Sequence, residues 1–353
     1  MGARRGTPVS DLVSLNQDSG RPAIVVTSIS APSRAMQKIA QGAADAGYDF
    51  IVIGDARSPS DFHSEGCDYY DLPRQRTTGL KFAEVCPMNH YARKNIGYLL
   101  AIRVGASLII ETDDDNSPQA NFWRTRRMKM TAPVVKTSGW VNVYRYFTQE
   151  LIWPRGLPLD AIQQEVPAFD ELPAAIDCPI QQGLADENPD LDAVYRLTLP
   201  LPRSFRKDII VALAARAWCP FNSQNTAWWP PAYPLLYLPS YCSFRMTDIW
   251  RSFVAQRIAW ENNWNIIFQS PDVSQNRNPH NLMRDFEDEV PGYLHNRAIA
   301  STLDCLSLKR GTKHTRDNLR RCYLALVRGG WMKEDELCLM DVWLDDLKSI
   351  VSA

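Results

Sequence analysis

Two kinds of segment alternate over the first third of the chain. Residues 22–30 (PAIVVTSIS) and 49–55 (DFIVIGD) are short β-branched runs, which are typical of buried strands. Between them, residues 33–47 carry apolar side chains at helical spacing and end at a glycine, which predicts a helix. Residues 91–106 repeat the helical spacing, and the apolar run SLIIE (107–111) then predicts a further strand.

This order of elements predicts an α/β fold with a mostly parallel sheet. Strand–helix–strand, followed after an insertion by helix–strand, is the pattern that right-handed crossovers produce. In such sheets ligands bind beyond the carboxyl ends of the strands. Ser28, Asp55 and the acids that follow residue 111 all fall at those ends. We therefore expect a ligand site there.

The rest of the chain has a different pattern. Residues 118–240 are rich in proline and tryptophan, which favours shaped loops over long regular elements. Residues 246–263 return to helical spacing, and residues 295–353 read as helices. One of these helices carries an apolar stripe, which self-association and core packing explain equally well. The stripe consists of Leu337, Met340, Leu344 and Leu347.

These patterns predict three parts. Residues 1–20 lack the apolar core of a secretory signal, and we expect a disordered leader. Residues 21–294 form the main domain, with a ligand-binding part at 21–118 and a second part at 119–294. Residues 295–353 form a helical C-terminal extension.

Composition narrows the function classes. The net charge of −1 over 353 residues argues against nucleic acid or an anionic membrane as the main partner. No run of about eighteen apolar residues is present, so we expect no transmembrane segment. The eight cysteines contain no Cys-x-x-Cys pair, which argues against a zinc cluster. We expect reduced thiols and a cytoplasmic location.

Three consecutive aspartates, Asp113, Asp114 and Asp115, follow the third predicted strand. Two like charges about 5 Å apart repel by roughly 3 kcal/mol at an effective dielectric of about 20. One interpretation is a solvated turn or a helix cap. The other is an Asp-x-Asp site in which Asp113 and Asp115 bind Mg²⁺ or Mn²⁺, since hard cations prefer carboxylate oxygens. A metal would cancel the repulsion and allow a diphosphate to bind.

Two basic residues, Arg93 and Lys94, begin the helix that precedes this strand. Solvated charges on a helix surface are the default interpretation. The helix macrodipole disfavours cations at a helix start, however, so their position fits an anionic ligand.

The segments AIVVTSIS, DFIVIGDARSP and YARKNIGYLLAIRVGASLIIETDDDN resemble the STELLO group of glycosyltransferase-like proteins. More distantly, they resemble the plant reversibly glycosylated polypeptides, which are UDP-arabinopyranose mutases. The likeness covers residues 22–290 and leaves out the leader and the residues after 290. It continues in WPRGLPLD (153–160), IQQGLADENPDLDAVYRL (180–197), FNSQNTAWWPPAYPLLYLP (221–239) and RMTDIWRSFVAQRIAW (245–260).

The resemblance implies a GT-A fold, in which a Rossmann-like nucleotide-binding half joins an acceptor half. It also implies that the three aspartates are the motif that holds Mn²⁺ or Mg²⁺ under a nucleotide diphosphate. Ser28 and Asp55 match positions near the uridine or its ribose, and Arg93 matches a basic residue that faces the nucleotide. With Lys94 and Asp114, these residues form the expected nucleotide-binding set.

The resemblance also implies a sugar-side set of residues. Arg155 matches the arginine that becomes glycosylated in the mutases, although a structural salt bridge is an equal alternative. Asp190 and Asp192 match acids beside the sugar, or are turn residues. Asp248 matches the second acid of the mutase DDxW motif, near the reacting carbon, or is an ordinary acid at a helix start. Trp228 and Trp229 stack on an acceptor sugar or pack in the core.

The chain departs from the mutase pattern at two positions. Thr247 replaces the first acid of the DDxW motif, and Gln269 stands where the mutases have a histidine. His280 is then the candidate for a third metal ligand, although a lone histidine in a polar loop is more often simply exposed.

The leading hypothesis is a metal-dependent glycosyltransferase that uses a UDP-sugar donor and a glycan or other hydroxyl acceptor. Asp248 would deprotonate the acceptor, or would flank the anomeric carbon if configuration is retained. One alternative is a nucleotide-sugar mutase that glycosylates itself at Arg155. The other is a non-catalytic scaffold that uses the fold for protein contacts, including homo-oligomer formation.

Overall fold

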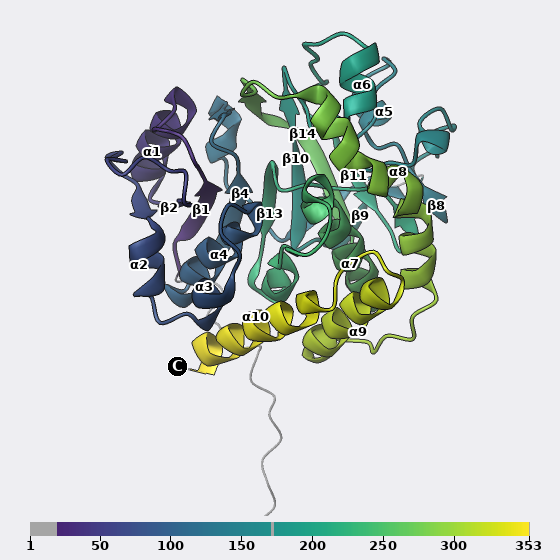
Figure 1. The fold of residues 1–353 in the computed structure, drawn as a ribbon. Coiled ribbons are helices and arrows are strands. Elements are labelled where there is room, and N and C mark those ends of the chain that lie inside the picture. The colour runs from purple at the N-terminus through teal and green to yellow at the C-terminus, as the bar shows by residue number, and fades with distance from the viewer. Residues whose placement is uncertain (1–19, 171–172, 353) are drawn as a thin grey trace, which may run out of the picture.

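A ten-stranded sheet runs through the centre of the protein (Figure 1). The computed structural model describes residues 20–170 and 173–352, so the predicted leader lies almost wholly outside the described residues. The strand order is β3-β2-β1-β4-β13-β10-β14-β11-β7, with β5 paired to β14. The strands are β1 (Pro22–Thr27), β2 (Asp49–Ile53), β3 (Asp68–Tyr70), β4 (Leu108–Thr112), β5 (Asn116–Pro118), β7 (Val134–Val135), β10 (Ile180–Asp186), β11 (Ile210–Leu213), β13 (Asn225–Trp228) and β14 (Ile266–Gln275).

The sheet is mixed but mostly parallel. Strands β3, β2, β1 and β4 are parallel neighbours, and β13 then runs antiparallel to both β4 and β10. Two small sheets flank it, formed by β6 (Lys129–Ala132) with β9 (Ala174–Asp177) and by β8 (Gly139–Trp140) with β12 (Ala217–Trp218). The predicted fold class is confirmed, and the arrangement is consistent with a GT-A-like fold.

The helix α1 (Arg34–Ala46) connects β1 to β2 as the hydrophobic spacing predicted. The Ser33 hydroxyl caps its start by accepting a hydrogen bond from the Met36 amide at 3.1 Å. Gly47 ends it in the left-handed conformation with φ of 72°. Its buried face packs on β1 and β2 in a cluster that includes Ile24 and Val52. This face holds the first crossover against the sheet.

The helix α4 (Lys94–Arg103) differs from its prediction. The helical spacing was predicted over residues 91–106, but the helix ends at Arg103, and Val104, which follows it, is 65% exposed. All residues from Lys94 to Ile102 are buried instead, because α4 is packed between the sheet on one side and α10 (Asp335–Ser352) on the other. A helix covered on all sides needs no amphipathic pattern.

The loop-rich prediction for residues 118–240 missed the central strand β10. All seven of its residues are buried, although the segment IQQGLAD is too polar to suggest a core strand. Its amides are satisfied within the protein: Gln182 Nε2 donates to the Asn225 carbonyl, and Gln181 Nε2 donates to the Arg127 carbonyl. A strand can therefore be buried without a hydrophobic sequence pattern when internal hydrogen bonds satisfy its polar side chains.

The C-terminal helices α9 (Thr315–Arg328) and α10 lie along the lower end of the sheet, whereas α5 (Tyr144–Phe147) and α6 (Ala193–Thr198) lie towards its upper right (Figure 1). Helices α9 and α10 pack into the same core cluster as α4, through Tyr323 and Trp343 among others. The predicted domain boundary between residues 294 and 295 falls inside α8 (Leu282–Asp304). Met340 and Leu347 of the apolar stripe are buried in this cluster, so core packing accounts for the stripe. The helices are α2 (Leu72–Arg76), α3 (Lys81–Val85), α5 (Tyr144–Phe147), α6 (Ala193–Thr198), α7 (Thr247–Glu261), α8 (Leu282–Asp304), α9 (Thr315–Arg328) and α10 (Asp335–Ser352).

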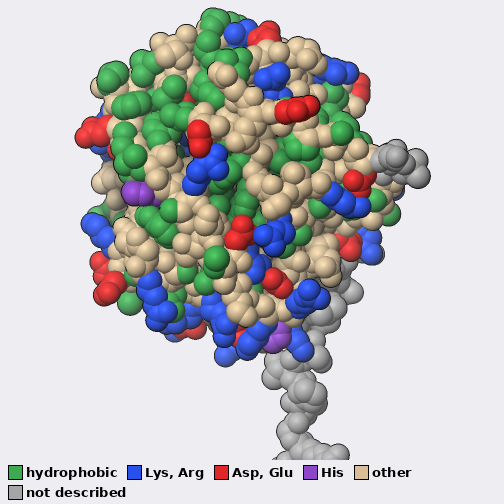
Figure 2. Space-filling model, turned by 90° about the vertical axis from the view of Figure 1, so that its right-hand side faces the viewer, with side chains coloured by type: hydrophobic (Ala, Val, Ile, Leu, Met, Phe, Trp, Pro, Cys, Tyr) green, Lys and Arg blue, Asp and Glu red, His purple; other side chains and the backbone are tan. Residues whose placement is uncertain are grey.

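The surface carries charges of both signs. On the side that Figure 1 shows at the right, acidic and basic side chains are interspersed among apolar patches (Figure 2). Within residues 20–170 and 173–352, no helix has both the length and the hydropathy needed to cross a bilayer. All eight cysteines are free thiols.

A buried ion pair links the sheet to α7. Glu111 of β4 accepts hydrogen bonds from both terminal nitrogens of Arg251, at 2.7 and 2.8 Å. Tyr98 Oη and Trp228 Nε1 donate to the same carboxylate. Because four donors surround it, the charge is fully compensated inside the core.

We predict that Arg251→Met will lower the free energy of unfolding by about 3–5 kcal/mol, because it leaves the Glu111 carboxylate buried without its cation. Urea unfolding measures the change. The double variant Glu111→Gln/Arg251→Met removes both charges and should lose less than the single variant. A single variant within about 1 kcal/mol of the parent would contradict this account.

Candidate functional site

A cavity of about 570 Å³ opens at the carboxyl ends of β1, β2 and β4. This is the edge of the sheet where the sequence predicted a ligand site. Most of the predicted site residues line the cavity, although they come from elements far apart in the chain. They are Ser28, Asp55, Arg93, Asp113, Asp114, Asp115, Arg155, Asp190, Asp248 and His280.

The three aspartates lie in the turn between β4 and β5, since β4 ends at Thr112. Each contacts a different part of the cavity wall. Asp113 accepts a hydrogen bond from Tyr91 Oη at 3.0 Å, and Asp114 accepts one from Ser28 Oγ at 2.6 Å. These contacts in a turn, and not the alternation of side chains along a strand, therefore orient the aspartates.

Asp115 is held from the other side of the cavity. Its carboxylate accepts hydrogen bonds from Gln275 Nε2 at 2.9 Å and from the Asn278 amide at 3.2 Å. Both donors come from the end of β14 and the loop that follows it. These neutral donors leave the negative charge of Asp115 without a cation in the described part of the chain.

The crowding of the aspartates is only partly relieved. Burial, against the opposing effect of Lys94 and together with the charges of Asp115 and Asp114, raises the pKa of Asp113 to about 7. Burial also raises the pKa of Asp114, where the hydrogen bond from Ser28 opposes the effect. The cluster therefore has too little positive charge around it.

Lys94 is a buried support of the cluster and does not line the cavity. Its ammonium donates to the Thr112 carbonyl at 2.6 Å and to Tyr91 Oη at 2.7 Å, and it lies 3.3 Å from Asp113 Oδ1. The nucleotide-facing role expected of Lys94 is thus replaced by support of the end of β4.

Arg93 lines the cavity, but its guanidinium is committed to the protein. Its Nε donates to Gln75 Oε1 at 3.0 Å, Nη2 donates to the same oxygen, and Nη1 donates to the Cys86 carbonyl at 2.9 Å. The side chain is buried, and these contacts tie the segment after α3 to η1 (Tyr91–Arg93). The geometry gives Arg93 a structural role beside the cavity.

The aspartates suit a divalent metal with few protein ligands. Carboxylate oxygens are the ligands that Mg²⁺ and Mn²⁺ prefer, and the incomplete charge compensation of Asp113 fits an additional cation. Across the described residues, however, no group of three or more His, Cys, Asp or Glu side chains is arranged to hold a metal. His280 lines the cavity but lies against Asp285, with Nδ1 3.2 Å from Oδ2. A metal here would complete its coordination with water and with oxygens of a substrate.

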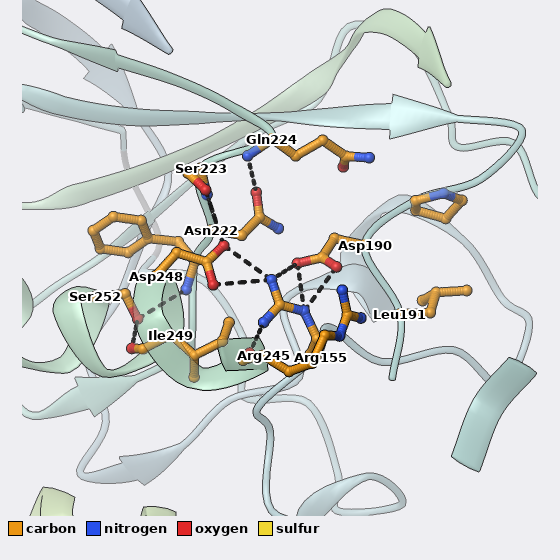
Figure 3. A network of polar contacts seen from close by, with 12 residues as sticks. Arg155, Asp190, Leu191, Asn222, Ser223, Gln224, Arg245, Asp248, Ile249 and Ser252 are labelled. Carbon is orange, nitrogen blue, oxygen red and sulfur yellow. Dashed lines mark hydrogen bonds and ion pairs between the residues drawn. The ribbon is translucent and has the colours of Figure 1, made fainter. Parts of the chain in front are cut away.

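The opposite wall of the cavity is an ion-pair network centred on Arg155 (Figure 3). Arg155 Nε donates to Asp190 Oδ1 at 2.9 Å, and Nη2 donates to both oxygens of Asp248 at 2.9 and 3.0 Å. Nη1 donates to the Arg245 carbonyl. Ser223 adds two hydrogen bonds to Asp248, from its amide and its hydroxyl, each at 3.1 Å.

This network decides the protonation of its members. Although burial raises the pKa of Asp248, the Arg155 guanidinium lowers it to about 2. Burial lowers the pKa of Arg155, but Asp190 and Asp248 together raise it well above its usual value. Asp248 therefore remains a carboxylate and Arg155 a cation at neutral pH. Neither the proton-accepting role suggested for Asp248 nor a nucleophilic Arg155 fits this arrangement.

Asp192 lies outside the cavity and caps α6. Its carboxylate accepts hydrogen bonds from the Tyr195 amide at 2.8 Å and from Trp153 Nε1 at 2.7 Å. Burial raises its pKa to about 6. Asp192 therefore has a local structural role at the start of α6 and does not lie beside a sugar site. Asp190, in contrast, takes part in the Arg155 network.

Sequence reasoning missed Tyr91, Ser223, Arg245 and Arg277. Tyr91 Oη lies 2.8 Å from Ser223 Oγ, which completes a hydrogen-bonded chain from Asp113 across the cavity to Asp248. Arg245 and Arg277 line the cavity beside Arg155. Both Tyr91 and Arg245 lie close in sequence to residues that the sequence analysis considered, Lys94 and the segment MTDIW. Nothing in the local sequence pattern, however, indicates that either side chain faces a cavity.

Two further expectations change. Gln269 lies within β14 and outside this cavity, because the strand continues to Gln275 before its loop reaches Asp115. Trp228 is completely buried, and its indole nitrogen donates to Glu111, so it packs in the core and cannot stack on an acceptor.

We predict that Asp248→Asn will lower the free energy of unfolding by about 2 kcal/mol at pH 7, because the depressed pKa of Asp248 reflects a stabilised charge. A depressed carboxyl pKa stabilises the fold above the unfolded value near 4, and this contribution is lost as the pH falls towards 2. Urea unfolding of both proteins should show the gap shrinking to about half near pH 3. A gap that does not change with pH would contradict the prediction.

Comparison with known proteins finds one family model and two curated relatives that are similar to this chain. The model of the family described as STELLO glycosyltransferases matches residues 245–352. This range contains Asp248 and also α8, α9 and α10, so the similarity extends past residue 290, where the sequence resemblance had ended. A solved structure titled "Crystal Structure of a Mycobacterial Protein" has a TM-score of 0.42 and 10% identity, and the match covers 82% of this chain and 80% of that one.

Two relatives from Arabidopsis thaliana match most of the chain. "Probable glycosyltransferase STELLO2" is 27% identical over 323 residues, and "Probable glycosyltransferase STELLO1" is 26% identical over 330. The matches cover 85% and 86% of this chain but 41% and 42% of the relatives, so the chain spans less than half of their length. Together, the family model and the two relatives support the assignment of this chain to the STELLO-type glycosyltransferases.

Proposed function

We propose that this chain is a metal-dependent glycosyltransferase domain that transfers a sugar from a nucleotide donor, a UDP-sugar, to a hydroxyl acceptor. The observation that carries the proposal is the position of Asp113, Asp114 and Asp115. All three line one cavity at the carboxyl ends of parallel strands, and the burial of Asp113 is incompletely compensated by the protein.

The nucleoside would lie over the ends of β1 and β2. Ser28 and Asp55 line this part of the cavity, and each is already fixed by the protein. Ser28 Oγ donates to Asp114, and the Asp55 carboxylate accepts hydrogen bonds from the His90 and Ala56 amides at 2.9 and 2.7 Å. Side chains held in this way can present oxygens to a base or ribose without a further loss of conformational freedom.

A divalent metal would be held by Asp113 and Asp115. Mg²⁺ and Mn²⁺ sites of this kind use one or two carboxylates, and substrate phosphates and water complete the coordination. When bound, such an ion stabilises negative charge on a departing diphosphate. The absence of a third acidic or histidine ligand among the described residues makes metal binding depend on the nucleotide.

The cationic role first expected of Arg93 fits Arg277 better. Arg277 lines the cavity, and its Nε is buried without a hydrogen-bond partner in the described part of the chain. Its Nη2 donates to Asp285 at 2.9 Å, which fixes the guanidinium. Arg245 stands nearby and is paired with Glu289. These guanidinium groups would offset the charge that develops on the leaving diphosphate.

Asp248 would act as a fixed negative charge near the reacting carbon. A carboxylate whose pKa is about 2 cannot accept a proton efficiently at neutral pH, but it can stabilise positive charge on the sugar. This supports the second role considered for Asp248, which applies when configuration is retained. The mutase alternative is less well supported, since Asp190, Asp248 and the Arg245 carbonyl engage all three guanidinium nitrogens of Arg155.

We predict that Asp115→Ala will abolish metal-dependent UDP binding, because it removes one of the two proposed metal ligands. Calorimetric titration of UDP in the presence of Mn²⁺ measures the effect. Asp61→Ala, which removes an exposed aspartate outside the cavity, is the matched control and should bind as the parent does. Unchanged UDP affinity in Asp115→Ala would contradict the proposed role of the cluster.

A further inference from the structure

A second cavity of about 400 Å³ lies on the sheet face that β6 and β9 cover. It shares no lining residue with the first cavity. Its floor includes the amide side chains of Gln181 from β10 and Gln269 from β14, which are hydrogen-bonded to each other at 2.7 Å. Gln269 is the residue that replaces the mutase histidine, and it therefore belongs to a site that the proposed transferase chemistry does not use.

One wall of this cavity is the segment from residue 124 to residue 131. Its burial alternates along the chain, so that Thr125, Arg127, Lys129 and Thr131 are exposed whereas the residues between them are partly buried. All four exposed residues line the cavity. The alternation thus presents two cations and two hydroxyl groups along the same wall.

The charge of this cavity is not balanced. Arg124 and Arg126 both pair with a single carboxylate, that of Asp272. The Arg126 side chain is only 4% exposed. Burial lowers the pKa of Arg126 against the attraction of Asp272, and the neighbouring Arg124 lowers it further. Two guanidinium groups on one carboxylate leave an excess positive charge beneath the cavity.

The exposed cations add to this excess. Lys129 lies 3.7 Å from Asp177, and both side chains are largely exposed, so screening by solvent makes this pair weak. Within the described residues, the ion pairs of this segment are formed by Arg124, Arg126 and Lys129. Arg127 forms none there. Four basic residues thus face one cavity with one buried carboxylate and one exposed carboxylate near them.

We propose that this second cavity binds a phosphate-bearing small molecule, with the phosphate held by Arg127 and Lys129 at the rim. Arginine presents a planar fork of donors that matches phosphate oxygens, and lysine adds a compact positive charge. The hydroxyl groups of Thr125 and Thr131 can donate further hydrogen bonds. The volume accommodates a molecule larger than a free phosphate.

The test is calorimetric titration of the full chain with inorganic pyrophosphate, without divalent metal. Pyrophosphate should bind the parent, and the double variant Arg127→Ala/Lys129→Ala should weaken binding about tenfold or more. The control variant Arg310→Ala/Lys313→Ala removes the same charge from exposed residues of the α8–α9 connection, and should bind as the parent does.

Three outcomes would overturn this proposal. The first is that pyrophosphate does not bind at all. The second is that the control variant weakens binding as much as the double variant, which would indicate attraction to net charge alone. The third is that only Arg277→Ala weakens binding, which would place the anion in the first cavity. UDP titration with Mn²⁺ tests the proposed transferase function separately, because Arg127→Ala/Lys129→Ala should leave that affinity unchanged.

Discussion

The buried ion pair between Glu111 and Arg251 sets the geometry on which the candidate site depends. Glu111 lies in β4, two residues before Asp113, and Arg251 lies in α7, one helical turn after Asp248. Because the pair joins the strand to the helix inside the core, it fixes the aspartate turn relative to the Arg155 network. An ion pair this deeply buried is costly to leave incomplete, which discourages alternative arrangements of β4 and α7.

The two walls of the cavity are further linked by hydrogen bonds between neutral groups. Tyr91 and Ser223 connect Asp113 to Asp248 without a charged intermediary. Within the described residues, the aspartate wall keeps negative charge without a paired cation, while on the opposite wall Arg155 holds both Asp190 and Asp248 in place. Such a division suits a donor whose diphosphate shares a metal with the aspartates and whose sugar lies against carboxylates in fixed positions.

The elements built from local signals were predictable from sequence. Ser33 and Gly47 delimit α1 through capping chemistry, and the β-branched runs of β1 and β2 needed no tertiary context. The aspartate cluster was found for the same reason, since it follows a recognisable strand. By contrast, β10 escaped detection because its polar residues are satisfied by partners distant in sequence.

The chemistry of the site was harder to predict, because pairing decides it. The protonation of Asp248 is set by Arg155, which lies 93 residues earlier in the chain. Arg93 was assigned a ligand-facing role from its helix-start position, but Gln75 and the Cys86 carbonyl occupy its donors. Motif resemblance located the residues that gather around the cavity, and only their contacts distinguished ligand-facing side chains from supporting ones.

The central claim is that two carboxylates and a nucleotide diphosphate hold a divalent metal jointly. Electron paramagnetic resonance of Mn²⁺ added to the protein, with and without UDP, tests this most directly. The account predicts weak binding of Mn²⁺ alone and tight binding of one equivalent once UDP is present. Tight binding of Mn²⁺ regardless of UDP, or free Mn²⁺ in the presence of saturating UDP, would contradict it.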